Sequence, residues 1–410
     1  MLVLNPGQQA VLNAAVNWFH NSSEQIFEFD GEAGTGKSVT LNAIIRELNL
    51  KPSQYMPMAY TGAAAIVMRT RGLSHAKTIH SSLYHAVEVP VFSDKPMKQV
   101  NTEMDIKRYV TRFEPIPPEM LSKDIKLFII DEGFMVPAAM KKELVKYGRK
   151  ILVTGDSGQL RPVEGQPAFL IGDNVMHLTE IMRQAANNPI LYLAHQARRG
   201  LPISCGLYGN DALVITTDEL TPEMVVNSGP IICGRNNTRD YFNRVVRQYF
   251  GYTDEFPTYG ERLICRNNNW EKDVDGISLT NGLSGYCISP FDICRFDRYK
   301  YEFDFLADMA NIPFYGLKLD VPYFTAPNAE VRRQLKEKIN TTKARFYSGE
   351  LFEYAYAITT HVSQGSEYPC GLIYEEHLGG GASFHAKLLY TAITRFKQKL
   401  ILVKEAPRYR

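Results

Sequence analysis

Apolar runs alternate with amphipathic stretches through the first part of the chain. Runs with the length and composition of buried strands lie at 26–30, 56–60, 126–131 and 151–155. Helical patterns separate these runs, and such alternation is typical of a parallel sheet covered by crossover helices. We therefore expect residues 1–180 to form one α/β domain.

The same alternation returns further along the chain, where it is interrupted. Strand patterns recur at 230–233, 371–374 and 399–403, and helical patterns recur at 236–250 and 383–393. The segment between these groups, 256–345, differs in composition and is rich in Tyr and Phe. We expect a second α/β domain made of residues 181–255 and 346–410, with 256–345 inserted into it.

Aromatic residues inside this insertion predict a strand with one buried face. Charged residues alternate there with Tyr299, Tyr301, Phe303 and Phe305. The aromatic side chains form either the core of a small β-barrel, which we favour, or a platform on which bases stack. A smaller insertion at 85–125 contains alternating valines, followed by an expected hairpin turn at 93–96.

The segment Gly31-Glu-Ala-Gly-Thr-Gly-Lys-Ser38 lies between a strand pattern and a helix pattern. This is the context that a phosphate-binding loop requires. Backbone N–H groups of such a loop surround phosphate oxygens at the positive end of the helix. Lys37 would reach the β- and γ-phosphates, and the Ser38 hydroxyl would ligate Mg²⁺. The segment therefore predicts a nucleoside triphosphate site, against the alternative of an ordinary glycine turn before a helix.

Polar residues follow two of the later strand patterns. One run ends in Asp131 and Glu132, where the strand ends of a parallel sheet meet their ligand. Asp131 is expected to hold Mg²⁺, and Glu132 is expected to orient or deprotonate the attacking water. Gln159 follows the strand pattern at 151–155 and is a candidate to touch the γ-phosphate and report its hydrolysis. Taken alone, its segment would be interpreted as an ordinary turn.

Two arginines complete the candidate catalytic residues. Arg183 and Arg395 lie where a second domain could deliver a positive charge to the phosphates. Such a charge, acting in the transition state, is worth on the order of 10³–10⁵ in rate. For either arginine taken alone, the alternative is a surface charge.

Composition narrows the class of protein. Lys and Arg total 46 against 44 acidic residues, so a nucleic-acid partner must be held by a local basic groove. The six cysteines form no C-x-x-C pair, which fits free thiols in a reducing compartment, without disulfides or a structural metal. No apolar run approaches the roughly 18 residues of a membrane span, and no signal peptide is recognisable. These features favour a cytoplasmic protein without membrane contact.

Taken in order, the motifs resemble those of superfamily 1B helicases, and most closely the phage Dda and RecD-like group. They lie at Gln8, 31–38, 60–62, 78–80, 131–132, 155–162, Arg183, 361–367 and 390–395. The resemblance covers residues 4–395, although 85–125 and 256–345 match by position and size more than by residue. It implies an α/β fold of two RecA-like P-loop domains, with a β-hairpin pin at 85–125 and an SH3-like β-barrel at 256–345.

The resemblance also implies how individual residues bind ATP and Mg²⁺ at a cleft between the two domains. Gln8 would recognise the adenine edge, and Arg183 and Arg395 would act as arginine fingers. The site would be completed by Gln159, Gly365 and Glu367. The loop and metal residues in it would be Gly31, Gly34, Thr35, Gly36, Lys37, Ser38 and Asp131.

Single-stranded DNA is the partner that the resemblance implies. The residues expected to contact it, along a groove across both α/β domains, are Thr61, Thr78, His80, His361 and Ser363. For each of them the alternative is a local hydrogen bond that caps a helix or closes a turn. Phe92, beside the expected hairpin turn, is a candidate for stacking on the base at a junction of single-stranded and duplex DNA.

These expectations converge on an ATP-dependent DNA helicase that moves along single-stranded DNA and unwinds duplex. The 5′→3′ direction rests on the resemblance alone. A monomer, partners from a replication or recombination apparatus and, for a phage protein, the host cytoplasm are further expectations. The alternatives are a single-strand translocase or protein-displacing motor with little unwinding, and a P-loop switch or kinase independent of nucleic acid. An RNA helicase is also compatible, because the motifs do not report the 2′-hydroxyl.

Overall fold

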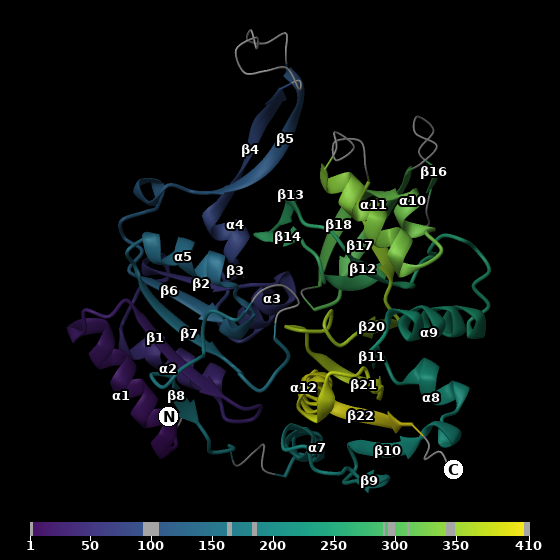
Figure 1. The fold of residues 1–410 in the computed structure, drawn as a ribbon, viewed down its shortest axis with the longest axis horizontal. Helices are drawn as coiled ribbons and strands as arrows, with labels where there is room; N and C mark the ends of the chain where they lie inside the picture. Colours follow the sequence, from purple (N-terminus) through teal and green to yellow (C-terminus); the bar gives the residue numbers. More distant parts are fainter. Residues whose placement is uncertain are drawn as a thin grey trace. The chain divides into compact units, whose positions relative to one another are not determined.

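The computed structural model describes residues 3–92, 106–161, 166–182, 187–289, 292–293, 300–309, 311–341 and 349–405. The chain forms two compact units, whose elements are labelled in Figure 1. The first unit consists of Met1–Thr78, Ser122–Thr253 and Tyr354–Arg410, and the second consists of Ile79–Leu121 and Asp254–Glu353. None of the described helices combines the length and the apolar character that crossing a membrane requires.

The first sheet of the first unit has six strands in the order β3-β2-β6-β7-β1-β8. The strands are β1 (Ile26–Gly31), β2 (Tyr55–Ala59), β3 (Lys77–Thr78), β6 (Leu127–Asp131), β7 (Lys150–Gly155) and β8 (Met176–Leu178). All neighbouring strands run parallel. The first four residues of β6 are completely buried, as expected of a central strand that is covered on both faces. The parallel sheet predicted from the apolar runs is therefore confirmed.

Helices cover this sheet and bury its apolar side chains. They are α1 (Pro6–Asn21), α2 (Lys37–Glu47), α3 (Gly62–Thr70) and α5 (Ala138–Lys146), with short 3₁₀ turns η1 (Pro52–Gln54) and η5 (Gly133–Met135). Val11 of α1 and Ile44 of α2 join Phe29 and Leu152 of the strands in one apolar core. Because α2 begins directly after the glycine-rich loop, this core holds the loop at the carboxyl end of β1.

A second sheet of six strands lies in the same unit, in the order β20-β11-β21-β22-β10-β9. The strands are β9 (Gly206–Tyr208), β10 (Ala212–Thr216), β11 (Ile231–Cys233), β20 (Ala357–Thr359), β21 (Tyr368–Tyr374) and β22 (Phe396–Lys404). The edge strand β9 is antiparallel to β10, and the other pairs are parallel. The accompanying helices are α7 (Pro189–Arg198), η6 (Thr217–Glu219), α8 (Pro222–Asn227), α9 (Asn236–Tyr249) and α12 (Gly381–Ile393). The predicted strands and helices of this region are present, while β10 and β20 were not predicted.

The second unit is rich in antiparallel strands. Strand β4 (Tyr84–Phe92), which follows α4 (Ile79–Leu83), pairs with β5 (Ile106–Pro115), after which comes η4 (Pro118–Met120). A separate sheet has the order β16-β17-β15-β12-β19, with β18 beside β17. Its elements are β12 (Arg262–Cys265), β15 (Ser284–Cys287), β16 (Asp292–Ile293), β17 (Lys300–Ala307), β18 (Ile312–Asp320) and β19 (Phe352–Tyr354). The neighbouring elements are the pair β13 (Asn269–Val274) and β14 (Ile277–Leu279), and the helices α10 (Val321–Phe324) and α11 (Ala329–Thr341).

The aromatic alternation predicted around residue 303 is present in β17. Phe303 and Phe305 are buried, and each ring packs edge-on against Phe352, with centroid distances of 5.1 and 5.0 Å. These two aromatic side chains therefore form apolar core, as in the interpretation we favoured, and are not open to stacking bases. The turn expected at 93–96 lies outside the described residues.

Candidate nucleotide site

The glycine-rich loop connects the end of β1 to the start of α2. Gly34 and Gly36 have φ angles of +87° and +82°, which favour glycine. A Cβ atom on Gly36 would lie 2.3 Å from Gln8 Nε2 and 2.6 Å from Met182 Sδ. Both the backbone conformation and the close neighbours therefore require glycine here, as a phosphate-binding loop does.

Lys37 and Gln8 both contact the backbone of this loop. The Lys37 ammonium donates to the carbonyl oxygens of Gly31 and Glu32, at 2.6 and 3.2 Å. Gln8 Nε2 donates to Thr35 O at 3.0 Å, while its Oε1 atom accepts from Asn5 N at 3.1 Å in the capping box of α1. The two side chains thus hold the loop in shape.

Asp131 and Glu132 lie at the carboxyl end of β6. Glu132 has a left-handed backbone, with φ of +53°, and its N–H donates to Asp131 Oδ1 at 2.9 Å. Burial, together with the adjacent Asp131 charge, raises the pKa of Glu132 to about 7, against the lowering effect of Arg395 and Lys37. Glu132 Oε2 is buried with no hydrogen-bond partner among the described residues. A carboxyl group that titrates near neutral pH and has an open oxygen is suited to accept a proton from water.

Arg71 is a residue of the site that the sequence did not reveal. It follows the last turn of α3, and its Nη1 atom donates to Ser38 Oγ at 2.8 Å. Its Nη2 atom lies 2.5 Å from Glu367 Oε1. The charges of Asp131 and Glu132 act on the same guanidinium and, with Glu367, raise its pKa against the effect of burial. In sequence, Arg71 is indistinguishable from an ordinary basic residue at a helix end.

Glu367 has a second cationic neighbour, Lys397, which sequence reasoning also missed. Lys397 Nζ lies 2.7 Å from Glu367 Oε1. Burial alone would raise the pKa of Glu367, but the charges of Lys397 and Arg71 lower it below its usual range. Glu367 therefore remains ionised at the edge of the site.

Arg395, which follows α12, meets Gln159, which follows β7. Arg395 Nη2 donates to Gln159 Oε1 at 3.0 Å, and its Nε donates to Thr391 O at 3.0 Å. Leu160 N donates to the Thr391 hydroxyl at 2.9 Å, and Gln364 Nε2 donates to Leu160 O at 2.8 Å. Two residues predicted to act on the γ-phosphate are thus joined, although they belong to different sheets.

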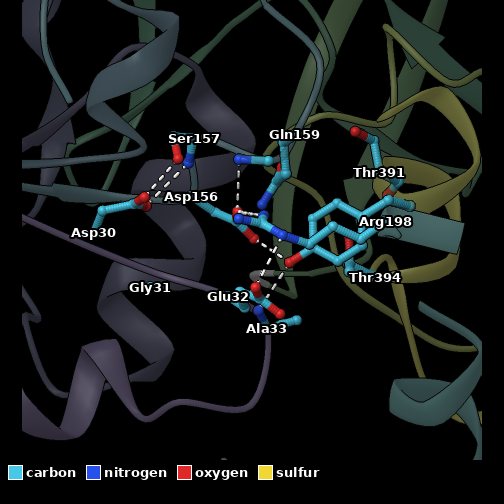
Figure 2. Close-up of polar contacts among 12 residues, drawn as sticks. Asp30, Gly31, Glu32, Ala33, Asp156, Ser157, Gln159, Arg198, Thr391 and Thr394 are labelled. Carbon is cyan, nitrogen blue, oxygen red and sulfur yellow. Dashed lines mark hydrogen bonds and ion pairs between the residues drawn. The ribbon is translucent and has the colours of Figure 1, made fainter. Parts of the chain in front are cut away.

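A further polar network links the two sheets, and its residues lacked predicted roles. The Tyr390 hydroxyl donates to Asp156 Oδ2 and accepts from Ala33 N, which lies 2.9 Å away in the glycine-rich loop. Arg198 of α7 lies 2.9 Å from Asp156 Oδ1 and 3.0 Å from Glu32 Oε1 (Figure 2). The loop therefore contacts α7 through an ion pair and α12 through the buried hydroxyl of Tyr390.

A cavity of about 410 Å³ lies among these contacts, and residues of both sheets line it. The predicted residues that line it are Gly34, Gly36, Lys37, Ser38, Asp131, Glu132, Gln159, Gly365, Glu367 and Arg395. Gln8, Gly31 and Thr35 do not line the cavity and instead contact the loop itself. The Thr35 hydroxyl donates to Glu32 O, and a Cβ atom on Gly31 would lie 2.5 Å from Thr35 Oγ1. Arg183 lies outside the described residues; Met182, which precedes it, lines the cavity. The volume is within the range of small-molecule sites.

The residues predicted to contact DNA are divided between the two units. Thr61 caps α3 by accepting from Ala64 N at 3.2 Å, and a Cβ on Gly365 would lie 2.6 Å from its hydroxyl. Ser363 is fully buried, and its hydroxyl donates to Thr360 O at 2.8 Å. Local capping and turn contacts, the alternative to DNA contact, are therefore present at both Thr61 and Ser363.

The other predicted DNA contacts are placed as follows. Thr78 is buried at the end of β3 in the first unit. His361 lies in the same unit, and burial lowers the pKa of its imidazole. In the second unit, burial lowers the pKa of His80, whose ring lies 5.0 Å from that of Tyr84. Phe92 ends β4 opposite Ile106. A single groove containing all of these residues remains a prediction.

The fold and the cavity define a P-loop protein in which loops of a second, mostly parallel sheet contribute to the candidate nucleotide site. The chain belongs to the AAA domain family, whose model matches residues 3–219. Residues 354–403 match the UvrD-like helicase C-terminal domain, and the two matches together make the chain a superfamily 1B helicase by family.

Similar proteins support this classification. The ATP-dependent RecD2 DNA helicase of Deinococcus radiodurans is 30% identical over 179 residues, which are 42% of this chain; the chain spans only 21% of that protein. A structure of two coordinating Pif1 helicases on forked duplex DNA has 18% identity and a TM-score of 0.54, covering 98% of this chain and 92% of that one. Bacteroides Pif1 in complex with ADP-AlF₃ and single-stranded DNA has 18% identity and a TM-score of 0.53, with the same coverage. At this identity, the structures establish a shared fold.

Proposed function

We propose that this protein is an ATP-dependent DNA helicase that moves 5′→3′ along single-stranded DNA and unwinds duplex. The observation that carries the proposal is the single cavity in which Lys37, Asp131 and Glu132 of the first sheet's loops meet Arg395 from the second sheet. A nucleotide bound there would touch both sheets, so hydrolysis could change how they are held together. The names of the relatives, which mention DNA unwinding and single-stranded DNA, support the choice of polymer.

Four residues of the cavity, Lys37, Ser38, Asp131 and Glu132, would have distinct roles in ATP hydrolysis. Lys37 would exchange its bonds to loop carbonyls for bonds to the β- and γ-phosphates. Ser38 and Asp131 would hold Mg²⁺, and they fit it because hydroxyl and carboxylate oxygens are the hard ligands that this ion prefers. Bound Mg²⁺ supplies positive charge that offsets the charge developing on the phosphate oxygens. Glu132, with its open oxygen, would accept the proton of the attacking water.

The contacts between the sheets provide a way to couple hydrolysis to movement. Gln159 would sense the γ-phosphate and release Arg395, which would then stabilise the transition state together with Arg183. After phosphate leaves, the bond between Gln159 and Arg395 would form again. Directed motion requires only that the two nucleotide states differ in their affinity for DNA.

For DNA contact we propose Thr61, Thr78, His80 and His361, with Ser363 supporting the turn that follows β20. Thr61 is the most direct link between the sites, because it lies against Gly365 at the nucleotide cavity. We propose that β4 and β5 form the pin and that Phe92 stacks on the junction base. Separating one base-pair step costs about 1.4 kcal/mol of stacking, which ATP hydrolysis would supply while a rigid pin splits the duplex as the strand is pulled past it.

The test is ATP turnover by wild type, Lys37→Ala and Lys142→Ala, with and without single-stranded DNA or RNA. Lys142 is exposed on α5 and serves as a matched lysine control. Strong stimulation by DNA in wild type and Lys142→Ala, lost in Lys37→Ala, is the expected result. Turnover that is indifferent to nucleic acid would instead favour a P-loop switch or kinase, and stimulation by RNA alone would favour an RNA helicase.

The second candidate is a translocase that displaces proteins without efficient unwinding. Strand separation on duplexes with 5′ or 3′ tails discriminates it from the helicase and measures direction in the same assay. We expect unwinding from the 5′ tail only. ATP turnover stimulated by DNA with no strand separation on either substrate would support the translocase.

A further inference from the structure

Away from the nucleotide cavity, a carboxylate and two imidazoles come together on the second sheet. Glu375 and His377 lie just beyond the end of β21, and His385 lies in α12. One ligand atom from each of these residues lies within 4.8 Å of the other two. No other group of this kind was found in the part of the chain that the structure describes.

The local fold explains how the three side chains meet. Glu375 N donates to Val403 O at 2.9 Å, so the extended backbone of β21 continues past its last residue. In extended backbone, side chains alternate, which places Glu375 and His377 on one side and Glu376 on the other. The glycines at 379–381 all have φ near +80°, and this left-handed turn brings α12 back toward the strand end. His385 of α12 is thereby returned to Glu375.

The neighbouring carboxylates Glu375 and Glu376 differ in how they are satisfied. Glu376 accepts hydrogen bonds from Gly234 N, Arg235 N and the Thr238 hydroxyl, at 2.8, 2.9 and 2.7 Å, and it also pairs with the Arg235 guanidinium at 3.0 Å. Glu375 has a side chain that is only 9% exposed, and among the described residues its carboxylate makes a hydrogen bond to the side chain of His385 alone, at 2.8 Å. A buried carboxylate without a full set of donors is costly.

Two polar atoms of the cluster are buried and have no hydrogen-bond partner among the described residues. They are Glu375 Oε2 and His385 Nδ1. Buried polar atoms in native proteins are paired in the large majority of cases, so an unpaired set around a carboxylate indicates a missing positive partner. Lys404 lines the adjoining cavity of about 440 Å³, where its ammonium donates to Ile203 O at 2.6 Å, and the described side chains include no ion pair between Lys404 and Glu375.

We infer that Glu375, His377 and His385 form a binding site for Zn²⁺, with water as the fourth ligand. Two imidazoles and one carboxylate favour zinc or a similar borderline metal, since Mg²⁺ and Ca²⁺ take oxygen ligands. Zn–N distances of about 2.0–2.1 Å place two ligand atoms of a tetrahedral site roughly 3.4 Å apart. The observed separations are within a side-chain adjustment of that value. The rings of His377 and His385 already stack, with centroids 4.2 Å apart.

A zinc ion bound by these three residues would crosslink α12 to the end of β21. The helix carries Tyr390 and Thr391, and Arg395 follows it directly, so its position determines how the second sheet meets the nucleotide. A metal that crosslinks the first part of this helix to the strand would hold those residues in place. The cysteine spacings gave no indication of this site, because its ligands are histidine and glutamate, brought together by the fold.

The experiment measures zinc bound by the untagged full chain after dialysis against limiting Zn²⁺. The proteins compared are wild type, His377→Ala, His385→Ala, Glu375→Gln and the control His20→Ala, which removes an exposed histidine at the end of α1. We expect one zinc per chain in wild type and His20→Ala, and at least a tenfold weaker affinity in the three ligand variants. Because His377 is exposed, its replacement should leave folding intact, which circular dichroism and nucleotide binding would verify.

Co²⁺ provides an independent reading of geometry. A tetrahedral site gives a strong visible absorption band with Co²⁺, and this band should be present in wild type and absent in His377→Ala. Zn²⁺ should also raise the melting temperature of wild type but not of His377→Ala. A folded wild type that takes up no zinc, or equal uptake by wild type and all three ligand variants, would overturn the proposal.

Discussion

The nucleotide cavity and the cluster around Glu375 both bury carboxylates, but they balance the charge differently. In the cavity, Asp131 and Glu132 face Arg71, Lys37 and Arg395, so the chain supplies its own cations. In the cluster, the only described side chains grouped with Glu375 are the imidazoles of His377 and His385, and only His385 makes a hydrogen bond to it. The cations of the nucleotide cavity can bind a negatively charged substrate. The carboxylate of the cluster lacks a positively charged partner. We infer from the comparison that a buried carboxylate with cationic side chains beside it suits an anionic ligand, whereas one without them suits a cation.

Removing Arg395 is expected to have the largest effect on the cavity side of this comparison. Arg395→Ala should lower DNA-stimulated ATP turnover by about 10³–10⁵, because charge stabilisation in the transition state is lost. Arg199→Ala, an exposed residue at the end of α7, is the control. The measurement is steady-state phosphate release, with fluorescent-nucleotide binding as a check on folding. A loss no greater than that in the control would show that Arg395 only holds Gln159.

Glu132 should make turnover depend on pH. Its pKa is raised to about 7, so the carboxylate that accepts the proton forms as pH rises, and turnover should increase about tenfold between about pH 6 and 8. Glu132→Gln should lower turnover by about 10²–10⁴ and flatten this profile, while the exposed control Glu47→Gln should keep it. Asp131→Asn removes a charge that raises the Glu132 pKa and is unsuitable as a control. A rising profile retained in Glu132→Gln would assign the titration to another group.

Arg71→Ala is expected to have an intermediate effect. It removes the donor to Ser38 and the partner of Glu367, and hydrogen bonds to charged groups contribute about 1.5–3 kcal/mol. Turnover should therefore fall roughly 10–100-fold. Arg71→Lys should recover only part of it, because lysine cannot reach both oxygens with a planar fork. The measurement is ATP turnover at saturating ATP and DNA. Full activity in Arg71→Ala would mean that the contacts of Arg71 matter only in the nucleotide-free state.

The smallest expected effects are on the free energy of unfolding, measured with one variant in the nucleotide cavity's polar network and one in the cluster around Glu375. Tyr390→Phe removes the hydroxyl between Ala33 N and Asp156 and should lower the free energy of unfolding by about 1–3 kcal/mol. Without zinc, Glu375→Gln should not lower it, because the exchange removes a buried charge without a full set of donors and leaves a polar neighbour for His385. Urea unfolding of both variants measures this difference. The opposite order would mean that Glu375 is already fully satisfied without a metal.

Much of the first sheet was predictable because its signals are local. The apolar runs that became β1, β2, β6 and β7 have strand length and lie between turn residues, and the glycines at 34 and 36 mark the loop. Strand β20 has only three residues, too few to show a periodicity. Strand β10 has a five-residue apolar run that the same criterion would have detected.

The candidate site was predicted in part for the same reason. Lys37, Ser38, Asp131 and Glu132 each stand next to a strand or helix end, and such ends carry ligands in parallel sheets. Arg71 and Lys397 lie beside no distinctive local pattern, and Tyr390 belongs to the motif at 390–395 without a predicted role of its own. The contacts of all three depend on which strands become neighbours. Ser363 was proposed for DNA from its motif, whereas the fold buries its hydroxyl against Thr360.

By itself, the sequence determined the class of fold and the phosphate-binding loop, because hydrophobic periodicity and glycine conformation act over a few residues. The tertiary structure alone decided that Arg395 meets Gln159, 236 positions away, and that Arg71 meets Ser38, 33 positions away. It also decided that Glu375, His377 and His385 lie close together beside the end of β21 in the second sheet. Such pairings follow from strand order and helix packing, which bring distant segments of the chain together. The local sequence pattern around each residue does not indicate them.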